Sequence, residues 1–552
     1  MTTVRGKLRN LLMDAVQRAQ QQGVLPPVAV PEITIETPQK PEHGDYASNV
    51  ALKMARTARM DPMSIALTLA NQIVSAGFLS GVEVAKPGFL NFRLSPAWLA
   101  SQVEDVLAQG TGYGSVPLGN GARVQVEYVS ANPTGPLHVG AGRGAALGDS
   151  LANVLAHAGY QVEREYYVND AGARMEAFYS TLYARYLQQF DIPAELPADG
   201  YVGEYMVDLA REIAQERGRE FLDLPKEEAL QRLGRLGTEK MLGRIRRDLE
   251  SMNVRFDRWF SEQSLYDTGL LDQTIELMRQ RGYVAEREGA VWFVSSALGE
   301  DRDNVLVRSN GAPTYFASDA AYHYDKFVLR GFDRVIDVWG ADHQGHVPRM
   351  KAMASALGID PARLELIIYQ LVSLKRSGKP VRMSKRTGEI ITLGEVLEEV
   401  GPDAVRFYLL ARSADGMMDF DLDLAKEQSA ENPVYYVQYA HARIASILRF
   451  AGEVDFSDGD VSLLTSEAEL DLIRKMLVLP ELVETAATTL APHHLPHYSQ
   501  EIAAVFHSFY KQCRVVTEDE PLTKARLKLV SACKTVLGNT LALMGVNAPE
   551  QM

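Results

Sequence analysis

Two loops of this chain carry residues that could bind and activate a phosphate chain. The first is a turn at residues 130–144, which contains His138 and several glycines. It lies between a predicted strand and a predicted helix, so the backbone N–H groups at the start of that helix would face an anion. The second loop, residues 375–386, has six basic residues among twelve and no acidic one. Its lysines are suited to stabilising a phosphoryl group during transfer.

Both loops follow segments that read as strands. Residues 123–129 alternate as a strand, and a helical pattern follows the first loop at 144–159. Two further β-like runs, 334–339 and 364–374, precede polar or basic loops. Strands that alternate with helices predict an α/β fold, a Rossmann-type, mostly parallel sheet with its ligands at the carboxyl ends of the strands.

The length of 552 residues predicts three or four domains. We expect an N-terminal α+β add-on domain at 1–115 and a catalytic core at 120–425. The core would contain an inserted helical subdomain at about 170–300, because helical patterns occur at 204–217 and 227–252. An all-α helical bundle should follow at 426–552.

Composition narrows the class of protein. Fifty-seven basic and 71 acidic residues give a net charge of −14, which argues against non-specific binding of nucleic acid. Cys513 and Cys533 are too few for a structural zinc site or a disulfide framework, so no structural zinc is expected. Without a signal-peptide pattern or a long apolar run, the sequence predicts a cytoplasmic protein that does not bind membranes.

Short motifs in both loops resemble a known family. Leu-His-Val-Gly-Ala at 137–141 and Arg-Met-Ser-Lys-Arg at 382–386 resemble the two signatures of class I aminoacyl-tRNA synthetases. Longer stretches are similar to bacterial arginyl-tRNA synthetases and extend the resemblance over the whole chain; they lie at residues 127–140, 315–319, 436–443 and 548–552.

The resemblance implies a two-step reaction. Arginine and ATP, accompanied by Mg²⁺, would give arginyl adenylate and pyrophosphate, and the arginyl group would pass to the terminal ribose of its tRNA. Members of this family usually need the tRNA bound before the first step. The implied partners are L-arginine, ATP and the cognate arginine tRNA, with no DNA, and we expect a monomer.

The resemblance also implies roles for particular residues. His138 and Lys385 would be catalytic, and no residue would be a dedicated metal ligand. The ATP-binding residues would be His138, Gly140, Gly142, Met383, Ser384 and Lys385. The arginine-binding residues would be Glu127, Asn132, Tyr315, Asp319, His343 and Gln344.

Arginine recognition also has a physical argument. A guanidinium is planar and permanently charged, and a carboxylate binds it through two hydrogen bonds. Tyr315 and Asp319 are four residues apart in a helix-compatible segment, so both side chains would face one pocket.

The tRNA surface is less sharply defined. Tyr436, Tyr439 and Arg443 would stack on unpaired anticodon bases. The two tyrosines also have the spacing of core residues. Arg244, Arg246 and Arg247 either meet the acceptor arm of the tRNA or form a solvated helix face.

Two departures from the family pattern leave alternatives open. Ala141 replaces the second histidine of the first signature, so the contribution of that imidazole is either absent or supplied by another residue, with His343 and His346 as the candidates. The second signature has Arg382 and Arg386 at its flanks. The alternatives are a non-catalytic tRNA-binding paralogue, and another class I synthetase such as the cysteinyl enzyme, whose zinc site these cysteines cannot build.

Overall fold

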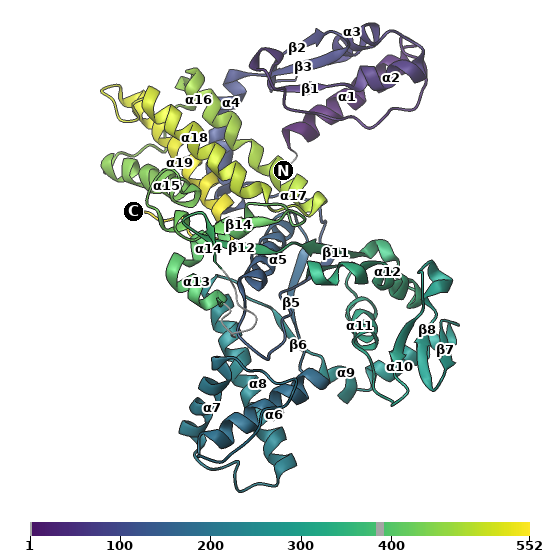
Figure 1. The fold of residues 1–552 in the computed structure, drawn as a ribbon. Coiled ribbons are helices and arrows are strands. Elements are labelled where there is room, and N and C mark those ends of the chain that lie inside the picture. Colours follow the sequence, from purple (N-terminus) through teal and green to yellow (C-terminus); the bar gives the residue numbers. More distant parts are fainter. Residues whose placement is uncertain (1–2, 75, 382–390) are drawn as a thin grey trace.

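A five-stranded parallel sheet forms the centre of the computed structural model, which describes residues 3–74, 76–381 and 391–552 (Figure 1). Its order is β11-β10-β4-β5-β6. The strands are β4 (Arg123–Tyr128), β5 (Gln161–Val168), β6 (Arg258–Ser261), β10 (Arg334–Gly340) and β11 (Leu364–Tyr369). From β4 the chain continues to β5 and β6 on one side of the sheet, and from β10 it continues to β11 on the other side. The strand order therefore reverses between β4 and β10, and ligands of such sheets bind at this switch point, beyond the carboxyl ends of the strands.

Helices cover both faces of the sheet. Consecutive residues of β5 show the two faces, because Tyr166 stacks on Trp259 whereas Tyr167 lies against Tyr322. Helix α5 (Val139–His157) connects β4 to β5 and packs on both strands. Tyr322 belongs to α11 (Tyr315–Tyr324), and α12 (Val347–Ala356) connects β10 to β11. The predicted Rossmann-type core is thus confirmed.

The predicted insertion consists of two parts, because β6 enters the central sheet between them. The first part is helical: α6 (Ala173–Gln188), α7 (Glu204–Arg217) and α8 (Lys226–Ser251). The second part combines two helices with a three-stranded antiparallel sheet: α9 (Gln263–Asp267), α10 (Leu270–Gln280), β7 (Val284–Arg287), β8 (Ala290–Phe293) and β9 (Asn304–Val307). The sequence indicated α7 and α8 but not α6, α9 or α10, and it did not indicate the strands, each of which has only four residues.

The N-terminal module is α+β, as expected. Its antiparallel sheet, in the order β1-β3-β2, packs with three helices. These elements are α1 (Val4–Gln21), β1 (Tyr46–Ser48), α2 (Val50–Ala58), α3 (Pro62–Gln72), β2 (Leu79–Ala85) and β3 (Phe89–Leu94). The next helix, α4 (Pro96–Gln109), packs on the C-terminal bundle instead, so the segment after residue 95 joins the bundle in space.

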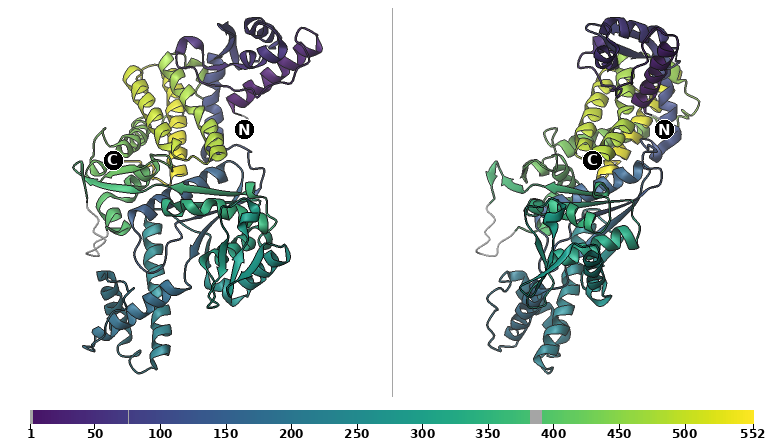
Figure 2. Two further views of the ribbon diagram at one scale, coloured as in Figure 1. Left: turned by 45° about the vertical axis from the view of Figure 1, so that its right-hand side comes forward. Right: turned by 90° about the vertical axis from the view of Figure 1, so that its right-hand side faces the viewer.

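The C-terminal bundle contains the expected helices and one more. It comprises α15 (Pro433–Phe450), α16 (Glu467–Met476), α17 (Val478–Thr489), α18 (His494–Gln512) and α19 (Glu520–Met544). Helix α17 follows α16 after a single residue, so the periodic pattern does not separate the two. Figure 2 shows the N-terminal module, the bundle, the central sheet and α6–α8 following one another along the long axis.

A small three-stranded sheet and two helices connect the core to the bundle. They are β12 (Val372–Arg376), β13 (Lys379–Pro380), β14 (Met418–Asp421), α13 (Leu393–Val400) and α14 (Pro402–Leu410). Helix α13 begins at a capping box in which Thr392 and Glu395 satisfy each other's backbone N–H groups, which fixes the helix start after the basic loop. No helix among the described residues is long and apolar enough to cross a membrane.

One buried guanidinium joins three parts of the molecule. Arg406 of α14 donates to the carboxylate of Asp149 in α5 at 2.6 Å, and to the carbonyl oxygens of Met252 and Met544, each at 2.7 Å. Met252 follows α8 and Met544 ends α19. Helix α5, the insertion and the bundle therefore share one fully buried cation.

Candidate functional site

The turn after β4 has an unusual backbone that its neighbours hold in place. Val129 and Ser130 have φ angles of +69° and +41°, a region that β-branched residues rarely adopt. The Ser130 hydroxyl donates to the Glu127 carboxylate at 2.9 Å and accepts a hydrogen bond from the backbone N–H of Tyr167 at 3.1 Å. The side-chain amide of Asn169 donates to the backbone carbonyl of Ser130. Such conformations persist where the surrounding structure fixes them, and they cluster at functional sites.

His138 lies at the end of this turn and caps α5. Its Nδ1 accepts the backbone N–H of Ala141 at 3.2 Å, so Nε2 carries the proton of the neutral ring and can donate to an anion. The ring is exposed at the helix N-terminus. Gly140 makes room for it, because a Cβ atom there would lie 2.8 Å from Cε1 of His138.

Gly142 has a packing role in the structure. It is buried within α5, and a Cβ atom would lie 2.7 Å from a methyl carbon of Leu393 in α13. The next residue, Arg143, is fully buried and donates to three backbone carbonyl groups, those of Gln370, Ser413 and Gly416. The start of α5 is therefore held against the segments that flank the basic loop.

A buried network of charges lies under the switch point. Lys326 is fully buried and contacts the carboxylates of Glu127 and Asp337 at 2.5 and 2.9 Å. His323 lies 2.9 Å from the other oxygen of Asp337, and its Nδ1 lies 2.8 Å from the backbone carbonyl oxygen of Asp319. Burial raises the pKa of Glu127, whereas Lys326 and His323 hold the pKa of Asp337 well below its usual range despite burial. The network ties Glu127 of β4 to the helix that carries Asp319.

Three polar groups gather at the carboxyl ends of β5 and β6 without a complete set of partners. The Asp319 carboxylate accepts no hydrogen bond within the described ranges. Glu262 Oε2 and the Tyr167 hydroxyl are buried and equally without a hydrogen-bond partner there. Burial raises the pKa of Asp319. Burial also raises the pKa of Glu262 to about 7, because the nearby Asp319 and Asp170 add to it while Ser318 and Tyr167 only partly oppose it. Tyr315, the residue one turn before Asp319, is about half exposed.

Sequence reasoning missed Glu262. It follows β6 directly, and it acquires its place beside Asp319 only through the pairing of β6 with β5. The signal that could have found it is an acidic residue at the carboxyl end of a strand. That signal was hidden because the strand is short and lies inside the predicted insertion.

The remaining predicted arginine-binding residues line the same edge. His343 and Gln344 are exposed in a 3-10 turn (Ala341–His346) that follows β10. The His343 ring lies 5.4 Å from that of His346 and 5.6 Å from Trp339. Burial, Arg349 and His343 lower the pKa of His346, so this ring is neutral at pH 7. Asn132 is half-buried in the turn before His138.

The basic loop is less positive than its sequence indicates, because acids from elsewhere pair with its first residues. Lys375 contacts Asp419 at 2.7 Å, and Arg376 makes two bonds to Glu399, at 2.6 and 2.9 Å. The predicted residues Met383, Ser384 and Lys385, with Arg382 and Arg386, lie outside the described residues.

The predicted tRNA-binding residues form an aromatic cluster on α15 and α18. Tyr435 and Tyr439 stack with centroids 6.2 Å apart, and the Arg443 guanidinium lies 5.1 Å from the Tyr439 ring and 4.8 Å from Tyr510. Tyr436 packs on His507, whose pKa burial and Arg443 lower to about 4. Tyr439 and Tyr510 are each more than one-third exposed. His441, in contrast, is buried under the C-terminal segment.

Three family models match successive parts of the chain. Residues 6–94 match the arginyl tRNA synthetase N terminal domain, residues 102–445 the tRNA synthetases class I (R) catalytic domain, and residues 437–552 the DALR anticodon binding domain. The second match includes β4 through α14 and reaches into α15.

Whole proteins and solved structures match as well. The arginine–tRNA ligase of Dehalococcoides mccartyi strain CBDB1 is 55% identical over 98% of both chains, and that of Carboxydothermus hydrogenoformans is 50% identical over 94% of both. The Thermus thermophilus arginyl-tRNA synthetase structure has a TM-score of 0.79 at 26% identity, with both chains fully covered. A putative arginyl-tRNA synthetase from Campylobacter jejuni has a TM-score of 0.77 at 35% identity, covering 83% of this chain and all of the other.

Proposed function

Because this chain belongs to the arginyl-tRNA synthetase family, we propose that it joins L-arginine to its cognate tRNA with the energy of ATP. In the first step a carboxylate oxygen of arginine attacks the α-phosphorus of ATP, and the bond to pyrophosphate breaks. In the second step a hydroxyl of the terminal ribose attacks the carbonyl carbon of the adenylate, and AMP leaves. The attacking carboxylate is already anionic, so the first step needs no general base.

The observation that carries this proposal is the pair of carboxylates at the carboxyl ends of the strands. Asp319 and Glu262 hold negative charge where burial opposes it, and both keep hydrogen-bonding capacity that the described residues do not use. A guanidinium supplies five N–H donors in one plane and a permanent positive charge. It would satisfy both acids at once, with the ring of Tyr315 and the Tyr167 hydroxyl beside it.

The α-amino end of arginine would face β4 and the turn that follows it. Glu127 supplies the negative charge there, balanced by Lys326, and Asn132 supplies an amide oxygen as an acceptor. His343 and Gln344 close the site from the turn after β10. This arrangement holds the arginine carboxylate toward the start of α5.

ATP would lie across the start of α5. The Nε2 of His138 and the N-terminal N–H groups of the helix would donate to phosphate oxygens, with Gly140 leaving the room for this approach. From the other side Lys385, with Met383 and Ser384, would stabilise the charge on the phosphates as pyrophosphate leaves. Mg²⁺ would accompany ATP and be held largely by phosphate oxygens and water.

The tRNA would bind with its anticodon on the aromatic cluster of Tyr436, Tyr439 and Arg443. Unpaired bases stack on tyrosine rings and on an arginine plane, and neither interaction needs a large positive field. This accounts for a tRNA partner of a chain with a net charge of −14. We further propose that the protein acts as a cytoplasmic monomer.

Arginine-dependent ATP–pyrophosphate exchange tests the function. The purified chain should exchange label between pyrophosphate and ATP when arginine and cognate tRNA are both present, and much less without tRNA. Lys385→Ala should reduce the exchange rate while leaving arginine binding intact. Absence of exchange under both conditions would exclude the enzyme and favour the non-catalytic paralogue.

A further inference from the structure

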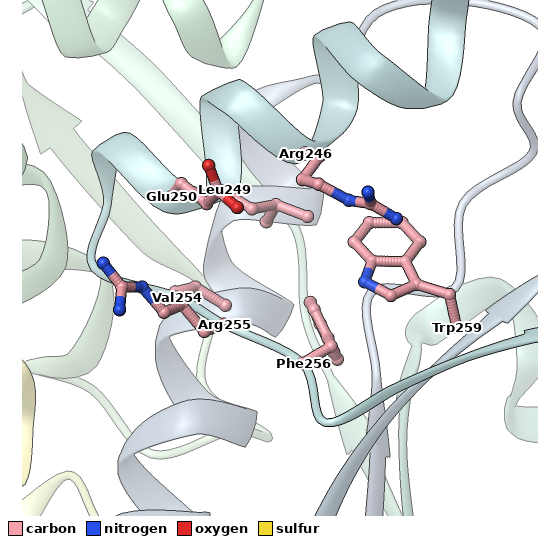
Figure 3. A pocket seen from close by; sticks show the side chains of 7 residues that line it. All are labelled: Arg246, Leu249, Glu250, Val254, Arg255, Phe256 and Trp259. Carbon is pink, nitrogen blue, oxygen red and sulfur yellow. The ribbon is translucent and has the colours of Figure 1, made fainter. Parts of the chain in front are cut away.

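A hollow of about 320 Å³ lies between α8 and β6, apart from the cluster of Asp319 and Glu262 (Figure 3). The end of α8 contributes Arg246, Leu249 and Glu250, and the segment leading into β6 contributes Val254, Arg255, Phe256 and Trp259. The volume is at the lower end of the range for pockets that hold small molecules, roughly 300–1,000 Å³. No residue that we assign to arginine or ATP lines it.

One wall of the hollow is a stack of three planes. Tyr166 of β5 stacks on Trp259 with centroids 4.3 Å apart and a 20° angle between the rings. On the far side of Trp259 lies the guanidinium of Arg246, 4.6 Å from the ring centroid. Figure 3 shows Arg246 directly over Trp259, with Phe256 below the opening. The exposed Arg246 therefore presents a flat, charged surface that the rings beneath it hold in place.

The positive charges of the hollow are not neutralised. Within the described ranges, neither Arg246 nor Arg255 has a carboxylate within ion-pair distance. Nearby cations on α8 differ, because Lys240 and Arg244 both pair with Glu212 of α7. Figure 3 shows Arg255 across the hollow from Arg246, with the Glu250 carboxylate at the rim of α8. The site thus offers a planar cation on one side, a second cation opposite, and one acceptor between them.

These groups match a nucleotide. A base stacks on an arginine plane, a phosphate binds a second guanidinium, and a carboxylate accepts hydrogen bonds from ribose hydroxyl groups or from a base amine. The hollow is also connected to the catalytic turn, since the Tyr166 hydroxyl donates to the carbonyl oxygen of Ala131 at 2.8 Å.

We propose that this hollow binds an unpaired nucleotide of the tRNA, with its base on Arg246 and its phosphate on Arg255. The proposal rests on the proposed function, which makes tRNA a substrate of this chain. It assigns Arg246 to RNA contact and gives it a specific pocket.

Equilibrium binding of cognate tRNA to the full chain tests the proposal. Arg246→Gln and Arg255→Gln should each weaken binding about tenfold, because the first removes the plane on which the base stacks and the second removes a phosphate contact. Arg246→Lys keeps the charge without the plane and should weaken binding nearly as much as Arg246→Gln. Arg235→Gln is the matched control, because this exposed arginine lies three turns earlier in α8 and does not line the hollow; it should change binding less than threefold.

The results that would contradict this proposal can be told apart from one another. If Arg246→Gln and Arg255→Gln bind tRNA as Arg235→Gln does, the hollow has no RNA partner. If Arg246→Lys binds like the unaltered chain, charge alone acts and no base stacks there. If millimolar AMP quenches Trp259 fluorescence while the glutamine variants keep their tRNA affinity, the hollow is a site for free nucleotides. Failure of the unaltered chain to aminoacylate tRNA would instead overturn the proposed function.

Discussion

In the proposed function, recognition of arginine depends on two acidic residues that reach one place from different elements. Asp319 comes from α11 and Glu262 from the end of β6, and each lacks hydrogen-bond partners in the described structure that a guanidinium could supply. An uncharged analogue of arginine would leave the charges of both carboxylates unpaired. Such a mismatch favours arginine over the analogue by a factor of ~10⁴ or more. The proposed pocket would therefore distinguish arginine from neutral amino acids.

Asp319→Asn should raise the KM for arginine about 100-fold, since removing one partner of a buried charged pair costs ~3 kcal/mol. The KM for tRNA, measured in the same aminoacylation assay, is the internal control and should change little. An unchanged arginine KM would show that the guanidinium binds elsewhere.

Arginine affinity should also depend on pH through Glu262. Its pKa in the free protein is about 7, so much of this carboxyl group is protonated at pH 6, and a bound guanidinium would lower the pKa by favouring the ionised form. Binding then releases a proton, and affinity rises as the pH increases from 6 to about 8. Calorimetric titration with arginine at several pH values measures this. Glu262→Gln should bind more weakly and lose the slope, whereas a flat profile for the unaltered chain would contradict the assignment.

The sequence revealed those site residues whose partners are near in the chain. Tyr315 and Asp319 are one helical turn apart, and His138 begins the helix that it caps, so spacing together with the family resemblance indicated these residues. Glu262 and Lys326 could not be found in this way. Their positions depend on which strands pair and on a buried network that joins residues 199 positions apart in the chain.

At the scale of elements, the N-terminal ends of two helices, α5 and α13, fix the segments next to the two predicted phosphate-binding loops. Arg143 ties the first turn of α5 to carbonyl groups on both sides of the basic loop, and the Thr392 capping box fixes the helix that follows the loop. The six cations of that loop looked unopposed in the sequence because Asp419 and Glu399 lie beyond it in the chain. Pairing gives Lys375 and Arg376, the first two of these cations, a structural role.

Helix α15 contributes the aromatic cluster that we propose to contact tRNA. Tyr439→Leu removes a partly exposed ring from the aromatic cluster and should raise the KM for tRNA about tenfold, with the arginine KM unchanged. Phe450→Leu is the control, because this residue is 77% exposed at the other end of the same helix. Equal effects of the two substitutions would show that the cluster does not contact tRNA.

At the scale of the whole molecule, helix α5, the insertion and the bundle meet at Arg406. A substrate as long as tRNA must contact distant parts of the protein at once, and these parts must keep a fixed relation for its end to reach the adenylate. Figure 1 shows α8, α5 and α19 converging where α14 passes. The domain sequence was visible in the chain, but this junction was not, because its members lie more than 100 residues apart.

Arg406→Met should destabilise the protein by about 3 kcal/mol or more, since it removes the buried cation that pairs with Asp149 and donates to two carbonyl groups. We expect a lower temperature for the first thermal transition and reduced aminoacylation at 37 °C. Arg412→Met, at an exposed position shortly after α14, should have neither effect. An unchanged transition in Arg406→Met would show that the three parts do not depend on this junction.

The most direct test of the account is tRNA charging by the purified chain with arginine and with citrulline, which has the same shape without the charge. The account predicts rapid attachment of arginine to cognate tRNA and attachment of citrulline at least ~10⁴-fold slower. Charging with neither compound, or with both at similar rates, would contradict the central claim that buried carboxylates select arginine for transfer to tRNA.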